Sequence, residues 1–301
     1  MIINDSVYGK IEFSKSIDNI IHSEPLQRLK NIHQGGAMFL AYPAIKTSRF
    51  EHSLGVCNLI RILGGDEKEQ IAGLLHDISH TAFSHVVDYV LGDREEDFHE
   101  KHKLRFLLNE GLVLNLRSLG LEPEEFLEDD KFHLLEADHP ALCADRIDYT
   151  LRDLIAWGKI SQLEAQQFIN SLQVIEDKIV VKSINLGEWF KDNYEYLNHY
   201  IFRDRKNILA NAELAKLIKK ALLINALCLE DLFNDDNFVM NIIQKNVLLK
   251  EDLKQIKNNL DREVAPDLKF KDRIVDPLVI DDEQIKLLSE CHGIKSDRSI
   301  S

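Results

Sequence analysis

Cysteine is scarce in this sequence, with four residues among 301, at positions 57, 143, 228 and 291. They lie far apart, and no two of them form the Cys-x-x-Cys pair that is typical of thiol zinc sites and redox dithiols. Three of them stand in apolar stretches with helical spacing. We therefore interpret the cysteines as reduced structural residues, which excludes a small domain held together by disulfides.

Long apolar runs are also absent. No segment approaches the roughly 20 apolar residues that a helix needs to span a bilayer. The first residues, MIINDSVYGKIEF, lack the basic stretch and the apolar run of a signal peptide. From these two absences we predict a cytoplasmic protein without membrane contact.

Positive charge is in short supply, because 37 lysines and arginines stand against 51 aspartates and glutamates and give a net charge of −14. This excess of negative charge argues against broad electrostatic binding to nucleic acid or to an anionic membrane. An anionic small molecule can still bind, but only where cationic groups gather locally. The 45% of apolar residues is ordinary for a globular protein, and a chain of 301 residues can bury a substantial core.

Most of the chain has apolar residues at helical spacing, which predicts an all-α fold of helices joined by short loops. The expected helices cover residues 53–63, 67–76, 102–108, 141–156, 163–169 and 210–229. At 174–181 two β-branched runs flank a polar turn, and there we predict a small β-hairpin. From about residue 234 the chain becomes more charged and less regular. We predict a helical domain over 1–233 and a looser helical or irregular C-terminal extension over 234–301.

Histidine is concentrated in one stretch, with six residues between positions 52 and 102. Any one of them alone could be a buried core histidine. The segment 71–77, however, is an apolar helix that ends in His76 and Asp77, and neutral imidazole together with carboxylate suits a divalent transition ion. His52, at an expected helix start, and Asp145, on a later helix, are the candidates for further ligands.

The helix expected at 141–156 carries two patterns. Apolar residues at positions 144, 147, 151 and 154 recur at helical spacing and form its core face. Polar residues at positions 145, 148, 149 and 152 form a second stripe on another face. A solvated surface and a functional face both fit this stripe, so the pattern alone leaves the two readings open.

The order His52, then His76-Asp77, then a distant Asp145 resembles the H…HD…D signature of the HD-domain phosphohydrolase superfamily. The runs RFEHSLGV (49–56), LLHDISHTAFSH (74–85), FHE (98–100) and ADRIDYTLRD (144–153) are similar to its deoxynucleoside triphosphate triphosphohydrolase branch, the SAMHD1-type enzymes. The opening DSVYGKIEF…QRLKNIHQGG…YP (5–43) resembles the N-terminal segment of the same branch. The resemblance covers roughly residues 5–155.

This resemblance implies a role for each matching position. The implied metal ligands are His52, His76, Asp77 and Asp145. The implied catalytic residues, which face the scissile phosphate as general acid or transition-state stabiliser, are His80 and His99. The implied substrate contacts are Gln34, Arg49, Arg146, Tyr149 and Asp153, with the two arginines on the phosphates and the other three on the sugar. We expect His85, which lies off the His76 face, to have a structural role behind the site.

The implied cofactor is one divalent metal ion, for which Mn, Fe, Co, Ni, Zn and Mg are all candidates, and a further Mg²⁺ on the substrate phosphates is compatible with it. The implied activity is hydrolysis of deoxynucleoside triphosphates to nucleoside and triphosphate, and the resemblance also implies a homo-oligomer. Two alternatives stay open, namely a nucleotidase acting on mono- or diphosphates and a non-catalytic nucleotide sensor. Phe202 aligns with a substrate-stacking tyrosine and Asp204 stands where histidine is usual, so the base preference is not predicted.

Overall fold

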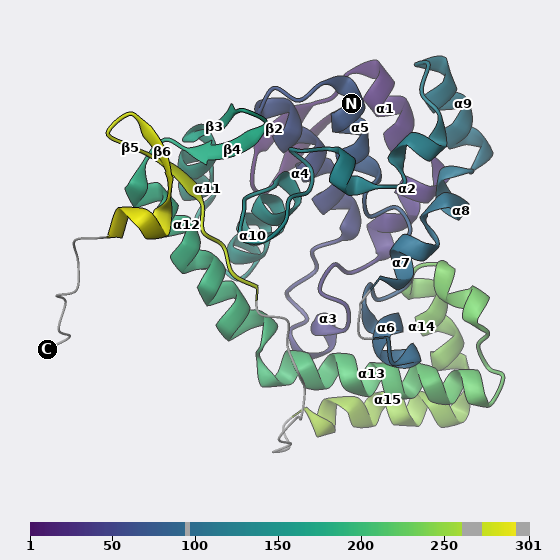
Figure 1. The fold of residues 1–301 in the computed structure, drawn as a ribbon. Coiled ribbons are helices and arrows are strands. Elements are labelled where there is room, and N and C mark those ends of the chain that lie inside the picture. The colour runs from purple at the N-terminus through teal and green to yellow at the C-terminus, as the bar shows by residue number, and fades with distance from the viewer. Residues whose placement is uncertain (94–96, 261–272, 293–301) are drawn as a thin grey trace, which may run out of the picture.

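The computed structural model describes residues 1–93, 97–260 and 273–292, and most of these residues are helical (Figure 1). The predicted all-α class is confirmed. The α-helices are α1 (Lys15–Ile21), α2 (Glu24–Arg28), α3 (Met38–Ala41), α4 (Arg49–Ile62), α5 (Glu67–Leu75), α6 (Val86–Leu91), α7 (Phe98–Lys101), α8 (Lys103–Leu107), α9 (Glu110–Ser118), α10 (Ala144–Ala156), α11 (Gln162–Asn170), α12 (Ile184–Tyr196), α13 (Arg205–Leu223), α14 (Asp236–Lys245) and α15 (Val247–Asn259). Among the described residues, no helix is long and apolar enough to cross a membrane.

The strands form two small sheets. An antiparallel hairpin joins β1 (Ile2–Asp5) to β2 (Gly9–Glu12). A second sheet has the order β3 (Leu172–Ile175), β4 (Lys178–Val181), β5 (Leu278–Asp281) and β6 (Gln284–Leu287). The β3–β4 pair confirms the hairpin that the sequence predicts at 174–181. The other two hairpins are not evident from the sequence, because strands of four residues are too short to show a clear alternation.

Helix α4 lies at the centre of the fold and is buried on nearly all of its faces. It begins at Arg49 because Ser48 and Glu51 form a capping box, in which each side chain accepts a hydrogen bond from the backbone N–H of the other. Helix α10 crosses it at Gly55, where a Cβ atom would come within 2.0 Å of a carboxylate oxygen of Asp148. Only glycine therefore allows this close approach of the two helices.

The described part of 234–301 packs against the rest of the chain. Helix α15 lies along α13, and β5 pairs in parallel with β4 (Figure 1). The side chain of Val279 is fully buried, and its Cγ1 would lie 2.7 Å from a Cβ atom at Gly187 of α12. The domain boundary at 233/234 stays a prediction, and residues 261–272 and 293–301 of the expected extension lie outside the described residues.

Candidate metal and substrate site

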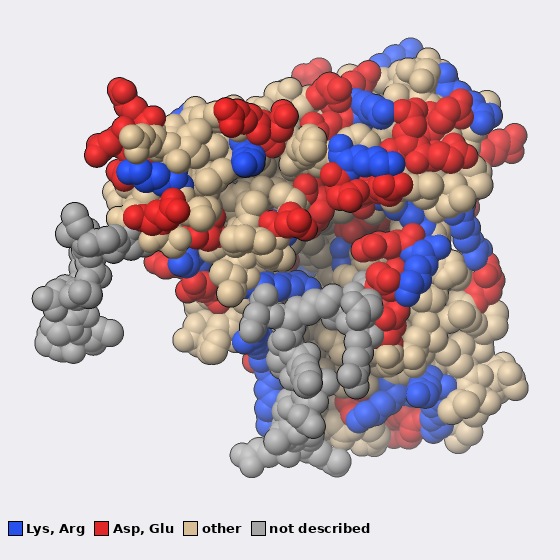
Figure 2. Space-filling view, in the orientation of Figure 1, with Lys and Arg blue, Asp and Glu red and all other residues tan. Residues whose placement is uncertain are grey.

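A large cavity of about 930 Å³ opens on the face shown in Figure 2, where acidic side chains are dense along one edge of the hollow. Its walls come from segments far apart in the chain, including the start of α4, the end of α5, the loop before α6, α7, α10 and the start of α13. This volume is in the range of small-molecule sites. All the site residues predicted from the sequence line this cavity.

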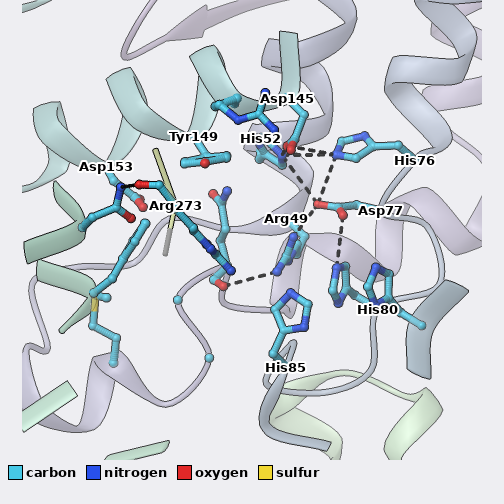
Figure 3. Close-up of a pocket in the computed structure, with 18 of the residues that line it drawn as sticks. Arg49, His52, His76, Asp77, His80, His85, Asp145, Tyr149, Asp153 and Arg273 are labelled. Carbon is cyan, nitrogen blue, oxygen red and sulfur yellow. Dashed lines mark hydrogen bonds and ion pairs between the residues drawn. The ribbon is translucent and has the colours of Figure 1, made fainter. Parts of the chain in front are cut away.

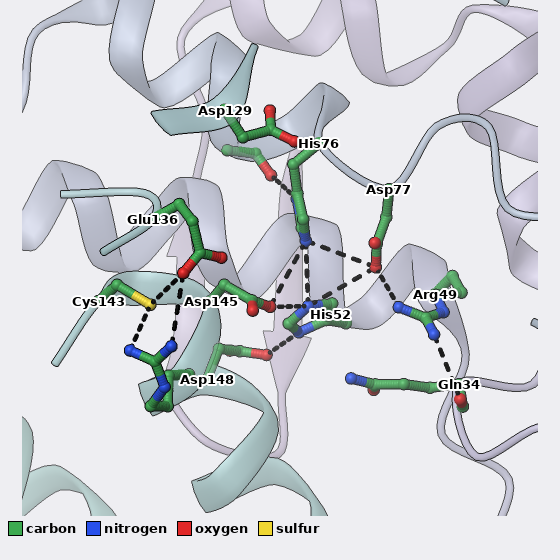
Figure 4. A network of polar contacts seen from close by, with 12 residues as sticks. Gln34, Arg49, His52, His76, Asp77, Asp129, Glu136, Cys143, Asp145 and Asp148 are labelled. Carbon is green, nitrogen blue, oxygen red and sulfur yellow. Dashed lines mark hydrogen bonds and ion pairs between the residues drawn. The ribbon is translucent and has the colours of Figure 1, made fainter. Parts of the chain in front are cut away.

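Four side chains converge on one point of the cavity wall (Figure 4). Nε2 of His52 lies 3.2 Å from Nε2 of His76 and 2.8 Å from Oδ1 of Asp145. Nε2 of His76 lies 3.4 Å from Oδ2 of Asp77 and 3.6 Å from Oδ1 of Asp145. Oδ2 of Asp77 lies 3.7 Å from Nε2 of His52. The first turn of α4, the residues after α5 and the first turn of α10 therefore bring the predicted quartet together.

The hydrogen bonds behind the two histidines fix which ring nitrogen faces this point. Nδ1 of His52 lies 2.8 Å from Oδ2 of Asp148, and Nδ1 of His76 lies 2.8 Å from the carbonyl oxygen of Gly73. Both partners can only accept hydrogen bonds, so both Nδ1 atoms carry the proton in the neutral rings and both Nε2 atoms present a lone pair. Four acceptor atoms then face one another in a buried space, which requires a cation or a proton between them.

The pKa directions express the same requirement. Burial acts to lower the pKa of His52, but hydrogen bonds to Asp145 and Asp148 raise it to about 10. Burial acts to raise the pKa of Asp77, but the charges of Arg49 and His76 hold it well below its usual value. The pKa of Asp145 is lowered too, because hydrogen bonds from the two histidines outweigh its burial. In the absence of another cation, protons on the imidazoles balance the carboxylates.

A divalent ion fits this donor set. Bonds of about 2.0–2.2 Å to nitrogen and oxygen place neighbouring donor atoms about 3.0–3.5 Å apart, and the distances within the quartet, from 2.8 to 3.7 Å, scatter around these values. Two imidazoles and two carboxylates are accepted by several transition ions and by Mg²⁺, so the donor set does not choose among them.

A buried network supports His52 from behind. Asp148 accepts from Nδ1 of His52, from the guanidinium of Arg152 through both of its oxygens, and from the hydroxyl of Tyr8 at 2.8 Å. Arg152 also binds Oδ2 of Asp5 at 2.8 Å, and Asp5 accepts from the backbone N–H of Val7 and of Tyr8. The N-terminal hairpin is thereby tied to a candidate ligand. The polar stripe of α10 is consequently not a solvated surface, since Asp148 and Arg152 are buried.

Arg49 connects the quartet to the rest of the cavity. Its NH1 donates to Oδ2 of Asp77 at 2.7 Å, and its Nε donates to the hydroxyl of Ser84 at 2.9 Å. Its NH2 has a longer contact of 3.5 Å to the carbonyl oxygen of Gln34, whose side chain also lines the cavity. This guanidinium therefore places a fixed positive charge directly beside the quartet.

Three histidines, His80, His85 and His99, form the adjoining wall of the cavity, and Figure 3 labels the first two. His80 stacks on His99 with ring centroids 3.9 Å apart, and Nε2 of His80 lies 3.1 Å from Oδ1 of Asp77. His85 meets both rings edge-on and lines the cavity, so the structure does not place it behind the site as we expected. Burial and the charge of Arg49 hold the pKa of His80 well below its usual value. Burial and His85 lower the pKa of His99 to about 3, so both rings are neutral near pH 7.

Tyr149 and Asp153 stand one turn apart on α10, on the side of the cavity away from His80 and His85 (Figure 3). The hydroxyl of Tyr149 lies 3.2 Å from that of Tyr194, and its ring centroid is 6.3 Å from that of Phe202. Asp153 is buried, and burial raises its pKa to about 7. An aromatic face and a carboxyl group are thus available to a polar organic ligand.

Arg146 lines the cavity, but its guanidinium is turned toward the loop that precedes α10. Its NH1 donates to the carbonyl oxygen of Ala141, and its NH2 donates to the carbonyl oxygen of Ala137 at 3.2 Å and lies 3.5 Å from Oε1 of Glu136. The predicted contact of Arg146 with substrate phosphates stays a prediction, and in this structure the side chain holds the loop.

Some lining residues escaped the sequence reasoning. They do not include Asp204, which stands where histidine is usual, caps α13 and accepts from the hydroxyl of Tyr42 at 2.7 Å. Asn207 and Asn211 follow it on the same helix, and Arg273 enters from the C-terminal segment. The asparagines share the helical spacing of a cavity-facing stripe, which is a weak signal in the sequence. The sequence does not indicate that Arg273 lines the cavity, because no pattern in it shows that a residue some 120 positions after α10 lies in the same cavity as α10.

The sequence matches the HD domain family over residues 49–153, a range that begins at Arg49 and ends at Asp153. It is 40% identical over 296 residues to the uncharacterized protein YdhJ of Bacillus subtilis, with 95% of this chain and 91% of that protein covered. It is 38% identical over 175 residues to the metal-dependent phosphohydrolase cns2 of Cordyceps militaris, with 58% of this chain and 50% of that protein covered. It is 29% identical over 233 residues to the deoxynucleoside triphosphate triphosphohydrolase SAMHD1 homolog of Dictyostelium discoideum, with 64% and 44% covered. The chain spans about half the length of the Cordyceps militaris protein and less than half of the Dictyostelium discoideum protein, and both of these names state an activity.

Proposed function

The chain belongs to the HD domain family of metal-dependent phosphohydrolases, and from this premise we propose that it hydrolyses nucleoside triphosphates, with deoxynucleotides as the preferred class, to nucleoside and triphosphate. One observation carries the proposal. The four acceptor atoms of the quartet lie in the same cavity as three histidines, several arginines and an aromatic wall. This combination suits a ligand that has a polyanionic end and a polar organic end.

In this proposal the quartet holds the divalent ion, and the residues around it hold the substrate. A bound ion supplies Lewis acidity, which polarises a phosphoryl oxygen and makes water a better nucleophile near neutral pH. Arg49 adds a guanidinium, whose planar donors match phosphate oxygens and whose charge is permanent. Its contact with Asp77 keeps that charge at the place where phosphate charge would develop.

The histidine wall would act without adding fixed charge. His80 donates Nε2–H to Asp77 and is held in one orientation by that contact. His99, whose pKa is lowered to about 3, is neutral near pH 7 and can donate one N–H to a phosphoryl oxygen. These pKa directions favour stabilisation of the transition state by hydrogen bonds over general-acid catalysis by an imidazolium ion.

At the other end of the substrate, Tyr149 would pack against the sugar and Asp153 would contact a sugar hydroxyl. Gln34, which also lines the cavity, would be a third contact of the sugar. The pocket beyond them is bounded by Phe202 and by the asparagines of α13. Arg146 is a further candidate for the phosphates, provided that it leaves the loop before α10. We also infer a homo-oligomer from the resemblance to the family.

Product analysis tests the proposed reaction. Purified protein is incubated with each of the four deoxynucleoside triphosphates and with deoxynucleoside mono- and diphosphates, in the presence of Mn²⁺, Mg²⁺, Co²⁺ or Ni²⁺. We expect nucleoside and intact triphosphate in equal amounts from the triphosphates. Release of orthophosphate alone, from mono- or diphosphates, would identify a nucleotidase, and no turnover across the panel would favour a nucleotide sensor.

A further inference from the structure

The loop between α5 and α6, which carries His80 and His85, contains a strained turn. Phe83 and Ser84, the two residues before His85, have φ angles of 62° and 53°. Residues with a side chain seldom adopt such left-handed angles, and for a bulky residue they are unfavourable. Both residues are buried, and the turn sets the direction in which the chain presents His85 to the cavity. The turn therefore has to be held by contacts with other parts of the chain.

The first turn of α14 supplies such a contact through Asp236. Oδ1 of Asp236 accepts from the backbone N–H of Phe83 at 2.6 Å. Oδ2 accepts from the backbone N–H of His33 at 3.0 Å and lies 2.7 Å from Nδ1 of the same residue. The side chain is buried, since only 4% of Asp236 is exposed. One carboxylate thus joins α14 to the strained turn and to the segment that leads into α3.

Further contacts fix the same part of the chain to the loop. The backbone N–H of Ala82 donates to the carbonyl oxygen of Leu232 at 2.8 Å. The guanidinium of Arg28 donates to carbonyl oxygens on both sides, to that of Ile78 at 2.8 Å and to that of Asn234 at 3.0 Å. The segment that leads into α14 is therefore fixed to the loop at more than one point, which keeps the start of α14 next to the turn.

The turn in turn holds Arg49. The hydroxyl of Ser84 accepts from Nε of Arg49 at 2.9 Å and donates to the carbonyl oxygen of His33 at 2.7 Å. The other short contact of Arg49 goes to Oδ2 of Asp77, which belongs to the quartet. Ser84 is therefore an anchor of the guanidinium that does not involve a candidate metal ligand. Asp236 reaches this anchor by two routes, through the backbone of the turn and through His33.

We propose that Asp236 is a positioning residue of this site, which holds the strained turn and thereby fixes Arg49 and His85 at the cavity (Figure 3). Asp236 does not line the cavity, and it lies outside the range 49–153 that matches the family. It therefore acts through the turn and not on a ligand. The inference rests on the proposed function for its effect on turnover, whereas its effect on Arg49 can be measured without any substrate.

The test removes the links between Asp236 and Arg49 one at a time. Asp236→Asn keeps the size of the side chain, but an amide accepts on one side only, so it loses either the hydrogen bond from Phe83 or those from His33. Ser84→Ala breaks the link at the Arg49 end, and it is also combined with Asp236→Asn. His33→Phe removes only the ring contact with Asp236, so it keeps the test falsifiable should Asp236→Asn fail to fold.

Asp235→Asn is the matched control. It makes the same chemical change one residue earlier, where Asp235 caps α14 and binds Asn31. Circular dichroism checks that each variant is folded. The first readout is hydrogen exchange of the Nε–H of Arg49 in ¹⁵N NMR spectra, with the signal assigned by its absence from Arg49→Lys. The second readout is kcat/KM on deoxynucleoside triphosphates.

We expect the Nε–H of Arg49 to exchange about ten- to a hundredfold faster in Asp236→Asn, as for the loss of a hydrogen bond to a charged group. In the same variant kcat/KM should fall by about tenfold or more, because a small displacement of a group that contacts substrate can cost that much. His33→Phe should change both readouts in the same direction by less, and Asp235→Asn should stay within about twofold of wild type. The double variant should exchange no faster than Ser84→Ala alone, since Asp236 acts through Ser84.

Unchanged exchange at Arg49 in Asp236→Asn and His33→Phe overturns the inference. Effects of Asp236→Asn and Ser84→Ala that simply add overturn it too, as does an equal loss in Asp235→Asn or a wild-type kcat/KM in Asp236→Asn. If exchange at Arg49 rises as expected but wild type hydrolyses no nucleotide, the assignment of Asp236 to the turn stands and the proposed function fails.

Discussion

Asp153 is a carboxyl group whose pKa is changed strongly by its surroundings. It lies on α10 two turns after Asp145, and it is buried with 8% of its surface exposed. Burial raises its pKa to about 7, although the charges of His52 and Arg152 oppose that rise. A carboxyl group with this pKa changes its charge near neutral pH and can either accept or donate a hydrogen bond there.

The sign of the pH effect follows from this shift. The pKa of Asp153 is raised in the folded protein above its value of 3.8 in the unfolded chain, so the folded state holds the proton more tightly. Its contribution to stability therefore falls as the pH rises from about 4 to 7 and is constant above that range. Asp153→Asn has no such penalty and should be more stable than wild type at pH 8.

Urea denaturation measures this difference. The gain in unfolding free energy of Asp153→Asn over wild type should be larger at pH 8 than at pH 5 by about 3 kcal/mol, since about two pKa units lie between pH 5 and the raised pKa and each is 1.36 kcal/mol. Asp252→Asn, on the surface of α15, is a suitable control and should show no comparable change. A gain that is the same at both pH values would mean that Asp153 ionises normally.

For single residues, the sequence could predict candidate metal ligands that are adjacent to one another in the chain. His76 and Asp77 stand next to each other at a helix end, and they were identifiable from spacing alone. His52 and Asp145 required the ordered blocks around them. The orientation of the two imidazole rings could not be predicted from the sequence. It depends on hydrogen bonds to the carbonyl oxygen of Gly73 and to Asp148. The contact between Asp148 and His52 forms only because α10 packs against α4.

Among the elements, α10 and the N-terminal hairpin together support the candidate metal site. Asp148 is fully buried and binds His52, Arg152 and Tyr8, so it joins α4, α10 and the hairpin. Carboxylates in this position fix the tautomer and the direction of a ligating histidine. The close packing at Gly55 makes this arrangement possible.

Substitutions in this network should change metal affinity without touching a ligand. Asp148→Asn is expected to weaken binding of the ion by about ten- to a hundredfold, as is usual for groups that orient metal ligands. Tyr8→Phe, which removes one hydrogen bond, should have a smaller effect in the same direction and cost about 1 kcal/mol of stability. The measurement is competition for the ion with a chelator of known affinity.

Tyr200→Phe serves as the control for the tyrosine, because Tyr200 is 62% exposed. Circular dichroism checks that Asp148→Asn is folded. If the folded variant binds the ion as tightly as wild type does, the hydrogen-bond network does not influence His52. Tyr8→Phe keeps the test informative should the loss of charge beside the buried Arg152 destabilise the fold.

Among the elements, the helices with clear apolar periodicity and the β3–β4 hairpin with its polar turn could be predicted from the sequence. The β5–β6 pair could not, since β5 gains its place by pairing with β4 and by packing Val279 against Gly187. These contacts join residues almost a hundred positions apart. The path of the C-terminal segment past the cavity could not be predicted either, because it also depends on contacts between residues far apart in the chain.

For the molecule as a whole, the central feature is a negative protein whose cavity wall carries arginines and histidines among its carboxylates. The net charge of −14 argues against broad electrostatic binding to nucleic acid, and an anionic ligand therefore requires a local cluster of cations. Arg49 and Arg273 now belong to that wall, together with the histidines and the candidate ion. The fold class and the metal-dependent chemistry were predictable, whereas the base preference and the ion depend on side-chain geometry that spacing does not contain.

The most direct test measures metal content and turnover on the same samples. Wild type, Asp77→Ala and the surface control Asp252→Ala are loaded with Mn²⁺, desalted, analysed for bound metal and assayed on deoxynucleoside triphosphates. We predict about one ion per chain in wild type and in Asp252→Ala, as for a four-ligand site. Asp77→Ala should lose the ion and about a hundredfold or more of the activity, because Lewis-acid stabilisation is worth several kcal/mol. Turnover at the wild-type rate by Asp77→Ala, or by wild type in excess chelator, would contradict the account.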